Sequence, residues 1–81
     1  MSMEIKVLGT GCARCKSLEA ATKKAAEELK LEAAIEKVED IQEIMSWGIL
    51  RTPGLVIDGK VVLSGQVPKM DELKEILIKN Q

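Results

Sequence analysis

The sequence contains no histidine, and its only aromatic residue is Trp47. Without histidine the chain has no imidazole base or imidazole metal ligand, so it cannot build a Ser-His or Cys-His catalytic pair. A single aromatic side chain also makes stacking on nucleic-acid bases an unsuitable mode of recognition. Reactive groups must therefore come from the two cysteines, the carboxylates, the lysines and the two arginines.

The chain also lacks blocks of like charge and long apolar runs. Its 12 basic and 13 acidic residues nearly cancel, and they alternate along the sequence. Nucleic acids and anionic membranes are bound by clustered lysine and arginine, so we expect neither as a partner. No apolar stretch reaches the length of a membrane span or of a secretory leader, so we expect a cytoplasmic location.

Hydrophobic periodicity predicts a βαβ unit in the first half of the chain. Over Met3–Leu8, every second residue (Met3, Ile5 and Val7) is apolar and falls on one face, which predicts a strand. Apolar residues at steps of three and four then predict a long amphipathic helix from Ala13 to Lys30. A shorter apolar stretch over Ala33–Val38 predicts a second strand. The two strands should be parallel and joined by a right-handed crossover.

A second, shorter helix is predicted after this unit. Asp40 is a suitable N-cap, and Gly48 is a suitable stop. The side chains expected on its buried face are Ile41, Ile44 and Met45.

The last part of the chain predicts a hairpin followed by a helix. Asp58 and Gly59 suit a tight turn between the apolar runs 55–57 and 61–63. Pro68 suits the first position of a final helix. The residues expected to face inward there are Met70, Leu73, Ile76 and Leu77. The order β-α-β-α-β-β-α predicts an α/β fold, in one domain over residues 1–81, with a four-stranded mixed sheet and helices on both faces.

The chemistry is expected at Cys12 and Cys15, which lie three residues apart at the start of the long helix. That spacing allows a disulfide, with Cys12 exposed at the helix end and Cys15 shielded on the inward face. The amides and dipole of a helix N-terminus favour an anion, which lowers the pKa of a thiol placed there. Arg14 adds positive charge that should tune the thiolate. We therefore expect Cys12 to be the nucleophile and Cys15 to resolve the mixed disulfide.

Metal binding is the alternative use of the same cysteine pair. A structural zinc site takes four Cys or His ligands, and this chain offers two cysteines. Copper(I) stays open because it prefers soft thiolates, of which two can suffice. Copper chaperones of this size typically run β-α-β-β-α-β, however, whereas here a helix is predicted before the hairpin. Our interpretation assigns no cofactor and no metal, and it keeps a copper(I)-binding module or chaperone as the alternative.

The element order, the pair Cys12 and Cys15, and Thr52-Pro53 ahead of the hairpin together resemble the thioredoxin superfamily. The compact form, with Gly-Thr-Gly at 9–11, resembles its glutaredoxin-sized archaeal and bacterial members, described as redox-active disulfide proteins. The resemblance covers essentially the whole chain. It implies a dithiol oxidoreductase that reduces disulfides in protein substrates. It also implies a cis Pro53, with the Thr52 backbone beside the sulfurs to pair with a substrate strand.

The chain departs from the family pattern around the cysteines. Thioredoxins have Trp before the first cysteine and Gly-Pro within the pair, where this chain has Gly11 and then Ala13 and Arg14. The glutathione contacts typical of glutaredoxins are not found. The resemblance therefore implies a flavoprotein thioredoxin reductase as the electron donor, and we expect the protein to act as a monomer.

A second departure concerns the proton of the resolving thiol. Thioredoxins carry a buried aspartate six residues before the first cysteine, and here Lys6 stands at that position. Glu4, on the same face of the strand, is a possible substitute. Glu36, Lys37 and Glu39 are interpreted as the solvated edge of a strand.

Overall fold

The computed structural model describes residues 3–10, 13–49 and 51–80. Within these ranges the elements follow one another in the predicted order β-α-β-α-β-β-α. They are β1 (Met3–Leu8), α1 (Ala13–Glu28), β2 (Ala33–Val38), α2 (Ile41–Ser46), β3 (Gly54–Ile57), β4 (Lys60–Ser64) and α3 (Met70–Lys79). The predicted α/β class is confirmed.

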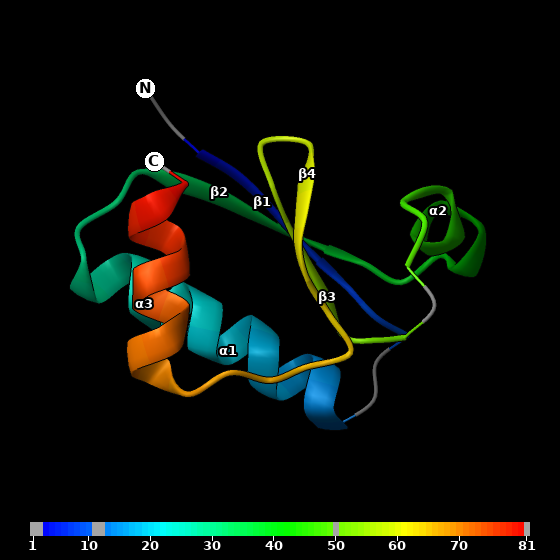
Figure 1. Cartoon of the computed structure of the whole chain (residues 1–81), viewed down its shortest axis with the longest axis horizontal. Coiled ribbons are helices and arrows are strands. Elements are labelled where there is room, and N and C mark those ends of the chain that lie inside the picture. The colour runs from blue at the N-terminus through cyan, green and yellow to red at the C-terminus, as the bar shows by residue number, and fades with distance from the viewer. Residues whose placement is uncertain (1–2, 11–12, 50, 81) are drawn as a thin grey trace.

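The strands form one mixed sheet in the order β2-β1-β3-β4. β1 and β2 are parallel, whereas β3 pairs antiparallel with both β1 and β4. Helices α1 and α3 lie together against one face, and α2 lies apart from them (Figure 1). The prediction of a four-stranded mixed sheet is therefore confirmed.

Two apolar clusters hold the helices against the sheet. The larger cluster joins α1 and α3 to the sheet, and its buried members are Met3, Ile5, Val7, Leu18, Ala25, Leu55, Ile57, Leu73 and Leu77. The smaller cluster lies under α2 and comprises Leu8, Val38, Ile44, Ile49 and Val56. Successive residues of a strand point to opposite faces, so β1 and β3 supply side chains to both clusters. Both faces of the sheet are thus covered, as predicted.

Helix α1 ends two residues earlier than predicted. Lys30 takes a left-handed conformation with φ of 55°. Its N–H donates to the Glu27 carbonyl at 3.1 Å, and the Leu31 N–H donates to the Ala26 carbonyl at 2.9 Å. This pair of hydrogen bonds is a Schellman motif, which ends a helix and satisfies carbonyl groups of its last turn. The sequence does not mark this end because a lysine, and not a glycine, occupies the left-handed position.

Helix α2 begins and ends where predicted, but its buried face is narrower. The Gln42 N–H donates to the Asp40 carboxylate at 2.9 Å, so Asp40 is the N-cap, and Gly48 follows with φ of 78°. Ile44 is buried, whereas Ile41 and Met45 are 61% and 67% exposed. The prediction that Ile41 and Met45 are core residues is wrong. Six residues make fewer than two turns, so few positions of the helix can face the sheet.

Helix α3 starts later than predicted. Its N-cap is Lys69, whose extended backbone (ψ of 159°) separates Pro68 from the first helical residue, Met70. The inward face is as predicted, because Leu73 and Leu77 are buried and the other two expected residues pack against the same cluster. No helix within residues 3–10, 13–49 and 51–80 has the length and apolarity needed to cross a bilayer.

The cap of α2 gives a test of this part of the fold. Replacing Asp40 with alanine removes the acceptor for the Gln42 N–H. We expect Asp40→Ala to lower the free energy of unfolding by about 1 kcal/mol in urea titrations, since an alanine cannot cap. Asp40→Asn should retain most of the stability because asparagine caps equally well. An equal loss in both variants would show that the charge of Asp40, and not its hydrogen bond, matters.

Candidate functional site

The predicted site residues fall on two segments of the described chain. Arg14 and Cys15 lie in the first turn of α1, while Thr52 and Pro53 lie between α2 and β3. The predicted nucleophile Cys12 lies outside the described residues. Cys15 is only 2% exposed, which agrees with its predicted shielding on the inward face of the helix.

The backbone of Gly9 lies directly against the side chain of Cys15. A Cβ atom added at Gly9 would contact the Cys15 Sγ and would lie 2.7 Å from the Cys15 Cβ. Real Cβ atoms do not approach this closely, so a residue without a side chain is required here. Gly9 is itself held to the sheet, because its N–H donates to the Val38 carbonyl at 2.9 Å. The end of β1 therefore forms the surface on which the Cys15 sulfur rests.

The sheet register brings Pro53 and Gly65 to the same end of the strands as Gly9. Leu8 pairs with Gly54, and Gly54 pairs with Ser64, so one further step places Gly9, Pro53 and Gly65 in a row. The Gly65 N–H donates to the Pro53 carbonyl at 2.8 Å, which extends the pairing to this row. Segments that lie far apart in the sequence thus meet beside the start of α1.

The loop before β3 has the geometry that the resemblance implies. The Thr52–Pro53 peptide bond is cis. Pro53 is fully buried, and Thr52 is partly exposed. Thr52 therefore occupies the accessible side of the loop, next to the row formed by Gly9, Pro53 and Gly65.

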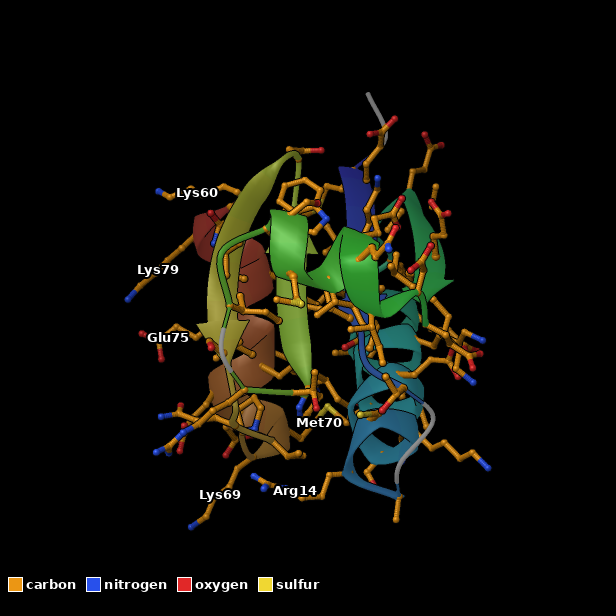
Figure 2. All side chains as sticks on the ribbon, turned by 90° about the vertical axis from the view of Figure 1, so that its right-hand side faces the viewer. Arg14, Lys60, Lys69, Met70, Glu75 and Lys79 are labelled. Carbon is orange, nitrogen blue, oxygen red and sulfur yellow. The ribbon has the colours of Figure 1, made fainter. Side chains whose placement is uncertain are left out.

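Arg14 spans from α1 to the loop between β4 and α3. Its Nη2 donates to the Gly65 carbonyl at 3.1 Å. Figure 2 shows Arg14 and Lys69 at the same end of the molecule. Gly65 has φ of 73°, and a Cβ there would lie 2.8 Å from the Arg51 Cβ, so a side chain at this position would disturb the loop. Arg14 is exposed, and its guanidinium is hydrogen-bonded to this backbone carbonyl.

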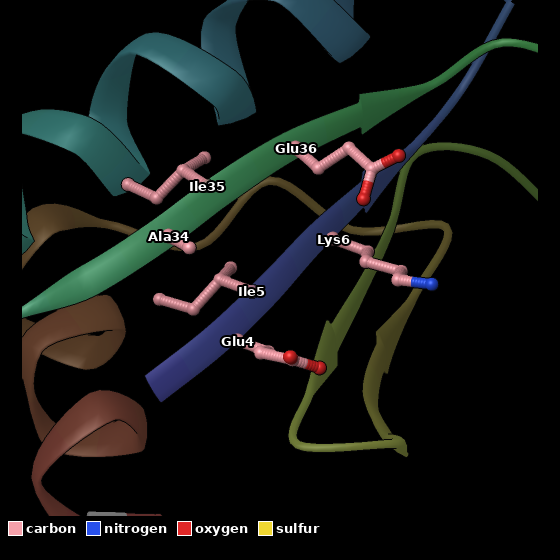
Figure 3. Close-up of a pocket in the computed structure, with 6 residues that line it drawn as sticks. All are labelled: Glu4, Ile5, Lys6, Ala34, Ile35 and Glu36. Carbon is pink, nitrogen blue, oxygen red and sulfur yellow. The ribbon is translucent and has the colours of Figure 1, made fainter. Parts of the chain in front are cut away.

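Lys6 and Glu4 do not lie beside Cys15. Both point to the face of the sheet opposite to that of Ile5, where they line a pocket of about 280 Å³ on β1 and β2 (Figure 3). The Lys6 Nζ lies 5.5 Å from the centre of the Trp47 ring, in a cation–π arrangement. The backbone of Glu4 is hydrogen-bonded to Asp58 in the hairpin turn, at the far end of β1 from Cys15. Glu4 is therefore no substitute for the missing buried acid.

Lys37 and Glu39 form an ion pair at the exposed edge of the sheet. The Lys37 Nζ lies 3.1 Å from the Glu39 Oε1, with the two side chains 31% and 56% exposed. The hydrogen bond and charge of Glu39 raise the pKa of Lys37 above its usual 10.5, against the effect of desolvation, and the charges of Glu19 and Cys15 raise it further. Glu36, Lys37 and Glu39 are exposed on the edge strand β2 or directly after it, so their interpretation as a solvated strand edge is confirmed.

Sequence reasoning missed Gly9 and Gly65 as site residues. A glycine after an apolar run is typical of a turn, so the sequence alone does not mark either residue as part of a site. A signal was present in the short spacing between Gly9 and the cysteine pair, but the contact with Cys15 follows only from the packing of α1. Within the described ranges, no group of three Cys, Asp or Glu residues is arranged to hold a metal ion.

Comparison with known proteins places this site in a known fold. A family model described as a thioredoxin domain matches residues 3–78. A thioredoxin of Methanothermobacter thermautotrophicus is 39% identical over 75 residues, which cover 93% of this chain and 97% of the relative. A thioredoxin of Methanocaldococcus jannaschii is 42% identical over 73 residues, which cover 90% of this chain and 84% of the relative.

A solved structure supports the same fold. The crystal structure of the germline-specific thioredoxin Deadhead from Drosophila melanogaster superposes with a TM-score of 0.66. The match covers 96% of this chain and 80% of that chain, at 18% sequence identity. At this identity the similarity concerns the fold alone.

The contact between Gly9 and Cys15 can be tested by adding one methyl group. We expect Gly9→Ala to lower the free energy of unfolding by about 1–3 kcal/mol, because the added Cβ overpacks a buried contact. Urea titration measures the change. Thr10→Ala, at the exposed neighbouring position, is the control and should stay within about 0.5 kcal/mol of the unmodified protein. A Gly9→Ala protein with an unchanged urea midpoint would contradict the close packing.

Proposed function

Since this chain belongs to the thioredoxin family and is a thioredoxin-like disulfide oxidoreductase, we propose that Cys12 and Cys15 are its redox pair and that it reduces protein disulfides. The observation that carries this proposal is the position of the Cys15 sulfur. It is buried at the start of α1, against Gly9 and beside the row that contains Pro53. A shielded thiol at this position suits a resolving cysteine, and the sequence places Cys12 three residues earlier.

The proposed reaction has two displacements. The thiolate of Cys12 attacks a sulfur of the substrate disulfide, forming a mixed disulfide and releasing the first substrate thiolate. The thiolate of Cys15 then attacks the Cys12 sulfur, and the second substrate thiolate leaves with the electron pair. The protein is oxidised by two electrons and the substrate is reduced by two.

Thr52 and Pro53 are proposed to receive the substrate. Pro53 is buried and its carbonyl already accepts from the Gly65 N–H, so Pro53 supports the loop and does not itself offer that acceptor. Thr52 is partly exposed and lies at the same end of the strands. An extended substrate segment that pairs with the Thr52 backbone would be held by main-chain hydrogen bonds, which tolerate many side chains.

We further propose that the protein acts as a monomer in the cytoplasm and is reduced by a flavoprotein thioredoxin reductase. The glutathione contacts of glutaredoxins are not found in the sequence, and a reducing compartment suits a disulfide reductase. Copper(I) binding is not proposed, because α2 precedes the β3–β4 hairpin and the topology is that of the thioredoxin fold.

Single cysteine variants test the assigned roles. Cys12→Ser should abolish the reduction of insulin, because it removes the attacking thiol. Cys15→Ser should attack and then stall as a mixed disulfide, which non-reducing gel electrophoresis and mass spectrometry detect. The unmodified protein, oxidised mildly, should show a monomer lighter by two hydrogens. Equal trapping of substrate by the two variants would overturn the assignment of nucleophile and resolving thiol.

The contribution of Arg14 is tested in the Cys15→Ser background, where Cys12 is the only cysteine. Removing the guanidinium removes positive charge near the start of α1, so Arg14→Ala should slow alkylation of Cys12 by iodoacetamide by about twofold at low salt. The hydrogen bond to the Gly65 carbonyl is exposed, so stability should change by no more than about 1 kcal/mol. Arg14→Lys is the matched control and should react at nearly the unmodified rate. An unchanged rate in Arg14→Ala would show that Arg14 serves the Gly65 loop alone.

A further inference from the structure

The two arginines of the chain lie against one residue, Gly65. Arg14 comes from the first turn of α1, and its Nη2 donates to the Gly65 carbonyl at 3.1 Å. Arg51 comes from the segment before β3, and a Cβ added at Gly65 would lie 2.8 Å from the Arg51 Cβ and 3.2 Å from its Cδ. The Gly65 N–H donates to the Pro53 carbonyl. Gly65 therefore joins both arginines to the loop that contains Thr52 and Pro53.

Neither guanidinium is paired with a carboxylate of the described residues. Both arginines are exposed. The ion pairs found over residues 3–10, 13–49 and 51–80 all involve lysines, and they are Lys37–Glu39, Lys74–Glu28 and Lys79–Glu75. The hydrogen bond to Gly65 uses one N–H of the Arg14 guanidinium, which has several more to donate. Because both side chains are already held against Gly65, binding a further acceptor orders them at a small entropic cost.

The other charges at this end of the molecule leave the surface around the arginines basic. Lys69 is exposed and lies at the same end as Arg14 (Figure 2). Asp71 and Glu72 follow in the first turn of α3, where the helix dipole favours them, and neither is paired with an arginine. Glu39 lies on the side of β2, at the edge of the sheet opposite to β4, and is already paired with a lysine. Unpaired positive charge is thus gathered on the β4 side of the site.

A substrate segment bound at Thr52 would lie beside both guanidiniums. Arg51 is the residue directly before Thr52, and Arg14 stands between the two cysteines. A segment that pairs with the Thr52 backbone and brings its disulfide to Cys12 therefore passes both side chains. A guanidinium binds a carboxylate through two parallel N–H···O bonds, a geometry that the ammonium group of lysine does not offer. The ligands that fit this place are the carboxylates of acidic side chains close to the substrate cysteine.

We propose that Arg14 and Arg51 are specificity-determining residues, which favour protein substrates with Asp or Glu beside the cysteine that is attacked. The proposal rests on the proposed function, because it requires that Cys12 attacks a segment bound at Thr52. The two guanidiniums attract the acidic segment during encounter and then donate to its carboxylates, so the first displacement is faster at a given substrate concentration. They take no part in the transfer of electrons.

The preference can be measured with three short peptides that carry one cysteine as a 2-thiopyridyl disulfide, flanked on both sides by Glu, Gln or Lys. Attack by Cys12 on the peptide sulfur releases thiopyridone, whose absorbance gives the rate of the first displacement. Each rate is divided by the rate of the same peptide with mercaptoethanol, which removes the intrinsic reactivity of its disulfide. At low salt the Glu peptide should react about three- to fivefold faster than the Gln peptide, and the Lys peptide should react slowest. High salt should reduce these differences.

Variants of Arg51 test its charge separately from its packing. Arg51→Met keeps the side-chain carbons beside Gly65 and removes the charge, so it should lower the Glu-to-Gln rate ratio by about twofold. The ratio is independent of the pKa of Cys12, because a change in that pKa alters both rates alike. Arg51→Lys should keep more of the ratio than Arg51→Met does. Lys60→Met removes the same charge from the hairpin end of β4, far from Gly65, and should leave the ratio unchanged.

The outcomes separate this inference from the function on which it depends. If Cys12→Ser released thiopyridone as fast as the unmodified protein, the proposed function would be overturned. If the reaction required Cys12 but the Glu-to-Gln ratio was near one, only the role of the arginines would be overturned. A high ratio that Arg51→Met and Arg14→Met both kept would also overturn that role. A ratio that fell equally in Lys60→Met would do the same, because it would show that the overall charge of the protein sets the preference.

Discussion

The contact between the Gly9 backbone and the Cys15 side chain is the constraint on which the rest of the site depends. Gly9 is hydrogen-bonded to β2, and its backbone lies directly against the Cys15 side chain. The absence of a side chain lets α1 start directly against the end of the sheet. Because the register continues from Gly9 to Pro53 and on to Gly65, this one close approach also sets where the two loops meet the helix. The position of the Cys15 thiol and that of the cis-proline loop are thus coupled through the sheet.

Charge is distributed on two sides of this contact. Arg14 donates to the Gly65 carbonyl on the β4 side, and Lys37 pairs with Glu39 on the β2 side. Arg14 stands between the two cysteines in the sequence, which is why we propose that its charge acts on Cys12.

The fold supports this site with few large side chains. Aliphatic residues fill the cluster between the sheet and helices α1 and α3, while α2 adds only Ile44 to the cluster on the other face. Lys6 over Trp47 helps to cover that second face, which a helix of six residues cannot cover alone. The position that holds a buried acid in thioredoxins is occupied here by Lys6, which packs over Trp47 on this second face of the sheet.

Much of the fold could be predicted from the sequence, because it depends on local periodicity. Alternation and helical spacing gave the seven elements in order, and the capping role of Asp40 follows from its side chain and its neighbours alone. The cysteine pair, and with it the type of chemistry, could also be identified from the sequence. Long-range packing decided the rest. Whether Met45 is buried, how close Gly9 comes to Cys15, and that Lys37 faces the same side as that thiol all depend on strand register and on where the helices lie. Those are properties of contacts between distant segments, and no local pattern of residues encodes them.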